Sequence, residues 1–169
     1  MNLEEFNNLD EGARRDALSK CCGANKWIEK MLNASAVESL ELLLEQADKN
    51  WYDCTESDWL EAFTHHPKIG DLKSLEKKFD STKEMAGNEQ SAVNVAAEDV
   101  LIELANHNER YEEKFGYIFI VCATGKSANE MLELLKTRIN NNSEEEIKIA
   151  MEEQNKITKL RLQKLLTEN

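Results

Sequence analysis

Proline and glycine are scarce in this sequence, with one proline and six glycines among 169 residues. Both interrupt helices, so their scarcity favours long helices over a turn-rich β-sandwich. The N-terminal residues lack the apolar region of a signal peptide, and no apolar run is long enough to span a membrane. We therefore expect a soluble, cytoplasmic, all-α protein: one domain over residues 1–169, a bundle of about eight helices.

Positive charge is also in short supply. Lysine and arginine number 21 against 33 aspartates and glutamates, which gives a net charge of −12. Proteins that bind nucleic acid or anionic membranes need clustered cationic side chains, so the composition argues against both kinds of partner. An anionic ligand would need a local positive group in this chain.

Residues that bind metals are few and badly spaced for that role. The three histidines include no H-x-x-x-H or H-E-x-x-H pattern, and no two of the four cysteines have C-x-x-C spacing. The sequence therefore predicts no metal site. We expect the cysteines to be reduced thiols, most of them buried as small apolar residues.

Capping residues predict where the helices begin. Asp10 precedes a helix that stops at Gly23, a short helix covers 26–32, and a long one runs from about Glu89 to about Lys114. Four further helices are predicted to begin at capping boxes: Ser35 with Glu38, Thr55 with Asp58, Ser127 with Glu130, and Ser143 with Glu146.

The segment GYIFIVCATG (116–125) is the one plausible strand, because it is rich in β-branched and aromatic residues. It has no second strand to pair with. We expect it to be an extended or short helical segment buried in the core.

The segment HHPKIGD (65–71) contains the only proline. Pro67 fixes its own φ angle and ends the preceding helix, so His66 lies at a rigid corner. An imidazole there is suited to general acid or base catalysis. The alternative is a histidine that only interacts with the last carbonyls of the helix. Of the two adjacent histidines, His66 is the better candidate because Pro67 follows it directly.

Arg161 and Gln154 interrupt the apolar face of the last helix. At about 100° per residue, the apolar arc of this helix is formed by Ile147, Ala150, Met151, Thr158, Leu162 and Leu165, and both polar residues fall inside it. A buried guanidinium must be paired. Arg161 is therefore a structural ion-pair partner, a side chain that extends to water, or an anchor for a carboxylate or ureido group.

Two helix starts give weaker signals. Gly125-Lys126-Ser127 precedes a capped helix whose free N–H groups could bind an anion, but an ordinary capped turn is the favoured explanation. Glu89 suits the first turn of a helix through the helix dipole alone. It gains a functional meaning only if it points at His66, where it would orient the imidazole and raise its pKa.

Taken in order, the motifs HHPKIGD, EQSAV, FGYIFIVCATGKSANEML and EEQNKITKLRLQKLL resemble the decarboxylases of 2-oxo-4-hydroxy-4-carboxy-5-ureidoimidazoline (OHCU). These are the third enzymes of the route from urate to allantoin. The resemblance covers essentially the whole chain. It implies an all-α homodimer with no cofactor that acts on a small ureidoimidazoline.

The resemblance also implies the site residues. His66 corresponds to the catalytic histidine and Glu89 to its acidic partner. The remaining residues correspond to substrate-binding positions: Pro67, Ala86, Gln90, Phe119, Ile120, Val121, Cys122, Ala123 and Arg161. Many members of the family have serine where this chain has Ala86, so any hydrogen bond from that hydroxyl is missing here.

The implied reaction is loss of CO₂ followed by protonation of one face by His66, which gives (S)-allantoin. Two alternatives stay open at this point. One is a non-catalytic, acidic helical interaction module, in which His66 and Arg161 are structural. The other is a decarboxylase of a related ureido acid, because of the altered position 86.

Overall fold

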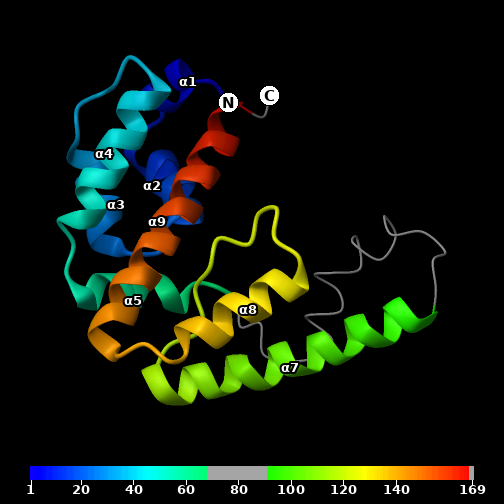
Figure 1. Cartoon of the computed structure of the whole chain (residues 1–169). Coiled ribbons are helices and arrows are strands. Elements are labelled where there is room, and N and C mark those ends of the chain that lie inside the picture. The colour runs from blue at the N-terminus through cyan, green and yellow to red at the C-terminus, as the bar shows by residue number, and fades with distance from the viewer. Residues whose placement is uncertain (68–90, 168–169) are drawn as a thin grey trace. The chain divides into compact units, whose positions relative to one another are not determined.

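The computed structural model describes residues 1–67 and 91–167, and of these it describes the side chains of all but 91–97. This part of the chain contains eight helices and no strand, so the predicted all-α class is confirmed (Figure 1). The helices are α1 (Leu3–Asn8), α2 (Glu11–Cys21), α3 (Asn25–Asn33), α4 (Leu40–Tyr52), α5 (Glu56–Thr64), α7 (Ser91–Phe115), α8 (Ala128–Arg138) and α9 (Ser143–Thr167). Within the described ranges, none of them is long and apolar enough to cross a membrane.

The chain forms two compact units. Unit 1 comprises Met1–His66, Ile120–Cys122 and the chain from Ile147 onward. Unit 2 comprises Pro67–Phe119 and Ala123–Glu146, so the first turn of α9 belongs to unit 2 and the rest to unit 1. The expectation of a single domain over residues 1–169 stays a prediction.

The core of unit 1 is built around α3, which contacts α2, α4 and α5. Met31 lies one turn after Trp27 and Ile28 on its inner face, and all three are buried. The indole N–H of Trp27 donates to the Ala47 carbonyl at 3.1 Å, which satisfies the polar atom of an otherwise apolar side chain. Burying side chains of this size stabilises the unit by roughly 1.5–3 kcal/mol each.

Helix α9 is tied to the rest of unit 1 along its length. The indole of Trp51 in α4 donates to the Met151 carbonyl at 2.8 Å, and Asp48 accepts from Asn155 at 2.7 Å. Near the far end of α9, the Met1 ammonium donates to the Leu165 carbonyl at 3.2 Å. The predicted apolar arc faces inward: Ile147, Ala150, Met151, Gln154, Thr158 and Leu162 are buried. Gln154 therefore lies in the core, as its place in the arc predicts.

Three of the predicted helix starts are confirmed. The Asp10 side chain caps α2, Thr55 and Asp58 form a capping box at α5, and Ser127 and Glu130 form one at α8. The predicted short helix at 26–32 is α3, which extends one residue further in each direction. The start of the predicted long helix at Glu89 lies outside the described residues.

The predicted capping box of Ser35 with Glu38 is wrong. Helix α4 begins one turn later, and Ser39 caps it by accepting from the Leu42 N–H at 3.2 Å. The carbonyl of Ser35 accepts a hydrogen bond from Gln46 instead, at 3.1 Å. This side-chain bond holds the segment before α4 in a non-helical conformation.

The predicted capping box of Ser143 with Glu146 is also wrong. The Asn142 side chain accepts from the Glu145 N–H at 2.9 Å and so takes the capping position. Glu146 is fully buried in unit 2, where it accepts hydrogen bonds from the Tyr111 hydroxyl at 2.5 Å and from Arg138 Nε at 2.8 Å, and it forms an ion pair with Arg138 Nη2 at 2.6 Å. Its carboxylate is needed by these donors and is not available to the helix start.

This carboxylate organises unit 2, in which α7 and α8 pack side by side (Figure 1). The Arg138 guanidinium also lies over the ring of Phe119, 4.4 Å from its centroid. The ring of Tyr111 contacts Phe119 edge-on, with centroids 5.2 Å apart. Burial, together with the bond to Glu146, raises the pKa of Tyr111, so the phenol keeps its proton and stays a donor.

The segment from Ile118 to Ala123 has no regular structure, and Phe119, Ile120 and Cys122 in it are buried. This confirms the expectation of a buried, unpaired segment. Gly116 and Gly125 flank it with φ of +82° and +74°. These are left-handed conformations that glycine adopts without steric cost, and they let the chain turn at both ends.

In unit 1, Gly23 makes room for the corner after α5. A Cβ at this position would lie 2.7 Å from the Cβ of His65 and closer still to its ring. Because the Cβ of His65 is fixed by the backbone, rotating the imidazole would not relieve this contact. Gly23 does not have positive φ, so its role here is spatial.

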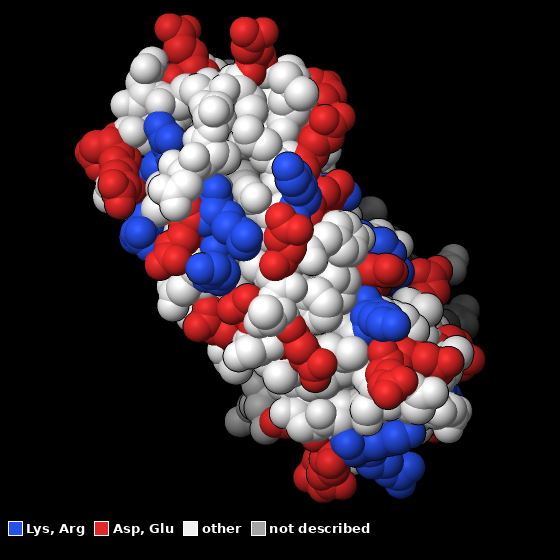
Figure 2. Space-filling model, turned by 90° about the vertical axis from the view of Figure 1, so that its left-hand side faces the viewer, with Lys and Arg blue, Asp and Glu red and all other residues white. Residues whose placement is uncertain are grey.

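On the face of the molecule drawn in Figure 2, acidic and basic side chains are interspersed. Glu103 and Lys136 form an ion pair at 3.3 Å, and both side chains are about half exposed.

We predict that Glu146→Gln lowers the free energy of unfolding by about 3–5 kcal/mol, because it leaves the buried Arg138 without a compensating charge. Urea denaturation measures the change. The control is Glu103→Gln, which breaks an exposed pair in the same unit and should cost less than about 1 kcal/mol. Equal losses in the two variants would contradict the central role of Glu146.

We also predict that Gly23→Ala costs about 1–3 kcal/mol through overpacking. The same substitution should cost less in a His65→Gly background, because the opposing Cβ is then gone. A double-mutant cycle by urea denaturation measures this coupling. An identical cost in the two backgrounds would show that His65 is not what Gly23 accommodates.

Candidate functional site

The corner after α5 is formed by local hydrogen bonds and by Pro67. The His65 N–H donates to the Ala62 carbonyl at 3.2 Å, and the His66 N–H donates to the Phe63 carbonyl at 3.3 Å. Pro67 follows and is exposed. The backbone N–H groups thus reach the last carbonyls of the helix, while the half-buried imidazole of His66 is directed elsewhere.

The imidazole of His66 meets α9. Its Nε2 atom is hydrogen-bonded to the Oε1 atom of Gln154, from 88 residues further along the chain. The Nε2 of Gln154 donates to the Thr158 hydroxyl at 3.1 Å, and that hydroxyl donates to the Gln154 carbonyl at 3.0 Å. Gln154 is 1% exposed and Thr158 is 2% exposed. The imidazole therefore lies against a buried polar pair inside an apolar helix face.

Arg161 lies on the same face of α9. Positions 154, 158 and 161 are one turn apart in succession, and the span from Gln154 to Arg161 is about 10 Å along the helix axis. The half-buried guanidinium donates to the carbonyl of Cys21 at 3.4 Å. The structure thus places His66 and Arg161 beside one stripe of one helix, within unit 1.

The thiols near this stripe are protonated at neutral pH. Burial raises the pKa of both Cys21 and Cys22 to about 11, although the Arg161 charge opposes the rise. Burial, together with Asp58, raises the pKa of Cys54 to about 12. All four cysteines are free and buried, as predicted. The three thiols with raised pKa are unsuited to nucleophilic catalysis, which requires the thiolate.

The segment expected to hold the substrate through its main chain is anchored to α9 in unit 1. The Cys122 N–H donates to the carboxylate of Glu153 at 3.4 Å, and Glu153 also pairs with Lys156 at 2.6 Å. Ile120 is buried and Val121 half-buried in the same unit. The two ends of the segment, Phe119 and Ala123, belong to unit 2.

The remaining predicted residues divide into two groups. Glu89, Gln90 and Ala86 lie outside the described residues. The turn at Gly125-Lys126-Ser127 is the ordinary capped turn of the simpler interpretation, because the Glu130 side chain accepts from the Ser127 N–H at 3.3 Å and Ser127 Oγ accepts from the Glu130 N–H at 3.2 Å.

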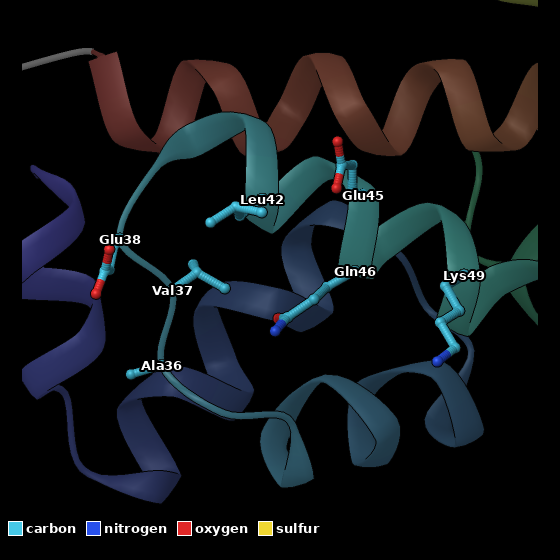
Figure 3. Close-up of a pocket in the computed structure, with 7 residues that line it drawn as sticks. All are labelled: Ala36, Val37, Glu38, Leu42, Glu45, Gln46 and Lys49. Atoms are coloured by element: carbon cyan, nitrogen blue, oxygen red, sulfur yellow. The ribbon is translucent and has the colours of Figure 1, made fainter.

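A surface depression of about 430 Å³ lies elsewhere in unit 1 (Figure 3). It is lined by α4 and the segment before it: Ala36, Val37, Glu38, Leu42, Glu45, Gln46 and Lys49. None of the predicted site residues lines it. In the described ranges, no group of three histidine, cysteine or acidic side chains is arranged to hold a metal ion.

Sequence reasoning did not assign a role to Gln154 or Thr158. Gln154 was detectable as a polar residue within an apolar arc, but its partner was not, because His66 is 88 residues away in the chain. Thr158 was counted among the apolar positions. The sequence does not indicate that its hydroxyl accepts a hydrogen bond from the Gln154 amide, which the structure shows.

Comparisons with known proteins agree with these features. Residues 7–163 match the sequence model of the OHCU decarboxylase family. The chain is 36% identical to the uric acid degradation bifunctional protein TTL of Arabidopsis thaliana, over 90% of this chain and 47% of that protein. It is 29% identical to the uric acid degradation bifunctional protein of Bacillus sp. strain TB-90, over 99% of this chain and 33% of that protein. The chain thus spans about half or a third of the length of these two relatives.

A third relative matches end to end. The 2-oxo-4-hydroxy-4-carboxy-5-ureidoimidazoline decarboxylase of Haloferax volcanii is 22% identical, over 96% of this chain and 94% of that protein.

Two solved structures share the fold. One is an OHCU decarboxylase crystallised in the presence of (S)-allantoin, with a TM-score of 0.72 and 34% identity over 90% of this chain and 99% of that one. The other is an (S)-allantoin synthase, with a TM-score of 0.70 and 16% identity over 98% of this chain and 54% of that one, which supports the fold alone. Since the family match extends over most of the sequence, this chain belongs to the OHCU decarboxylase family.

Proposed function

We propose that this protein decarboxylates OHCU to (S)-allantoin in urate degradation, without a cofactor. Family membership supports the reaction class. The observation that carries the proposal is the placement of the His66 imidazole and the Arg161 guanidinium beside one face of α9, far from each other in sequence. We also propose that the protein acts in the cytoplasm as a homodimer, as the family resemblance implies.

The substrate supplies its own electron sink. Loss of CO₂ from C4 leaves an electron pair that delocalises into the neighbouring ring C=N bond, which is conjugated with the 2-oxo group. The protein then needs to supply orientation, electrostatic stabilisation and a proton. Side chains of the kinds found at this site provide all three.

His66 is proposed as the group that moves a proton on one face of the ring. It either assists from the substrate hydroxyl during loss of CO₂ or protonates the carbanion afterwards. In both cases a fixed imidazole delivers one enantiomer, because only one face of the planar intermediate is presented to it. Glu89 is proposed to assist through its negative charge, which would raise the pKa of the imidazole.

Arg161 is proposed to anchor the polar groups of the substrate. A planar guanidinium forms paired hydrogen bonds with a carboxylate or ureido group, and its charge offsets the acidity of the protein as a whole. Main-chain groups from Phe119 to Ala123 are proposed to hold the ring. Pro67, Ala86 and Gln90 complete the proposed substrate contacts.

The decisive assay supplies freshly oxidised urate together with the hydrolase of the preceding step. With this protein present, the product should be optically active allantoin of one enantiomer, formed faster than in its absence. A slow, racemic product would reject the enzyme and favour a non-catalytic interaction module. Turnover of a related ureido acid in place of OHCU would redirect the substrate assignment.

We predict that His66→Asn lowers kcat by about 10²-fold or more, the usual scale for loss of a general acid or base. The remaining product should lose enantiomeric excess, which circular dichroism of the allantoin measures. The control is His107→Asn, since His107 lies in α7 and bonds to the Glu103 carbonyl of its own helix. Normal turnover in the His66 variant would remove this residue from the mechanism.

We predict that Arg161→Lys lowers kcat/KM roughly tenfold or more, because an ammonium lacks the planar pair of donors and a lost charged hydrogen bond costs about 1.5–3 kcal/mol. Steady-state kinetics measure the loss. Arg15→Lys is the control, because Arg15 is exposed on α2 and pairs with Glu11 at 3.8 Å. An unchanged kcat/KM for the Arg161 variant would mean that its guanidinium serves only as a structural contact to Cys21.

A further inference from the structure

We propose that Gln154 is a positioning residue that holds the Nε2 proton of His66, so that Nδ1 is the nitrogen through which the imidazole gains and loses its proton. Thr158 acts through Gln154 by fixing which way the amide faces. The catalytic part of this inference rests on the proposed function. The structural part, the tautomer of His66, does not.

The direction of the Gln154 amide follows from the hydroxyl of Thr158. A threonine hydroxyl has one proton to donate, and the one of Thr158 is directed at the Gln154 carbonyl, 3.0 Å away. The hydroxyl must therefore accept from the amide, which places the NH₂ group of Gln154 toward Thr158 at 3.1 Å. The amide oxygen is left facing His66, in agreement with the contact to Nε2.

An amide oxygen is only an acceptor, so the facing Nε2 atom of His66 must carry a proton. The opposite tautomer would place two acceptors against each other unless the amide turned over. Turning it would break the bond to Thr158. With Gln154 at 1% and Thr158 at 2% exposure, water could not replace that bond. Because Gln154 and Thr158 are buried, the hydrogen bond between His66 and Gln154 fixes the tautomer of the imidazole.

This arrangement suits an imidazole that changes its charge. The neutral Nε2–H tautomer and the imidazolium both donate to Gln154, so the bond persists while the proton at Nδ1 comes and goes. The amide cannot accept a proton itself, and it brings no negative charge that would hold the imidazole in its protonated form. The ring therefore keeps one orientation in both states, as stereospecific protonation requires.

The first test is the ¹⁵N NMR spectrum of the ligand-free protein labelled at histidine. His65, His66 and His107 contribute, and the His66 signals are assigned by their loss in His66→Asn. In the neutral state we expect a pyrrole-like shift for Nε2 and a pyridine-like shift for Nδ1. Gln154→Met should move both signals toward the average of two tautomers.

Matched controls come from the same helix. Gln163→Met repeats the substitution at a half-buried position two and a half turns along α9. Thr167→Val removes a hydroxyl that bonds to the Gln163 carbonyl at 2.7 Å, the same local bond as at Thr158 but exposed. Both controls should leave the His66 spectrum and the turnover unchanged, whereas Thr158→Val should shift both in the direction of Gln154→Met.

Kinetics give the second readout. Gln154→Met should lower kcat by about tenfold, on the scale expected for a misoriented acid or base. KM should change little, because Gln154 supports the imidazole without being a substrate anchor. Circular dichroism confirms that each variant is folded, and Thr158→Val, an isosteric change, provides the test should Gln154→Met fail to fold.

Two results would overturn the inference: a wild-type His66 with its proton on Nδ1, or an Nε2–H tautomer that survives unchanged in folded Gln154→Met or Thr158→Val protein. Failure of the proposed function has a different signature. There, wild-type protein would fail to turn over OHCU while the tautomer result stood, because the NMR experiment contains no substrate.

Discussion

Helix α9 has to bury polar side chains inside the face that packs against the rest of unit 1, and the site depends on how it does so. Gln154 and Thr158 satisfy each other through two hydrogen bonds, which leaves one amide oxygen for a partner from elsewhere. His66 is that partner, and the lack of a side chain at Gly23 lets the corner that carries His66 approach. A buried amide without such a partner would destabilise the core. The hydrogen bond that satisfies the buried Gln154 amide therefore also fixes the imidazole of His66.

Unit 2 also buries a polar side chain, and in this case the side chain is charged. Glu146 is fully buried, and donors from Tyr111, Arg138 and Asn141 surround its carboxylate. Arg138 in turn covers the ring of Phe119, the first residue of the segment proposed to hold the substrate. The partners of Glu146 therefore contact the ring of Phe119 within unit 2. Both units use a buried polar group to fix a neighbouring element that hydrophobic packing alone would leave free to shift.

The sequence predicted the features that depend on neighbours in the chain. Pro67 marks the corner, Thr55 and Ser127 mark helix starts, and the lack of a partner strand identifies 116–125 as an unpaired segment. Its predictions were wrong where a residue far away in the chain binds a side chain that local spacing assigns to a neighbour. Ser143 with Glu146 has the spacing of a capping box, but Arg138 and Tyr111 bind the carboxylate. Likewise, the pairing of His66 with Gln154 has no local signature, since helical periodicity shows only that Gln154 faces inward. The roles of Glu89, Gln90 and Ala86 are predictions from family resemblance, and these residues lie outside the described part of the chain.

All four cysteines lie in unit 1, where they are buried in three places: two at the end of α2, one in the segment after α4, and one in the segment anchored to Glu153. A thiol reagent can reach them only when the surrounding structure opens, so the rate of alkylation of the native protein reports the free energy of local opening at each place. The chain thus carries built-in probes of one of its two units and none of the other. Alkylation followed by peptide mapping would show which parts of the helical core open together, without any label having to be introduced.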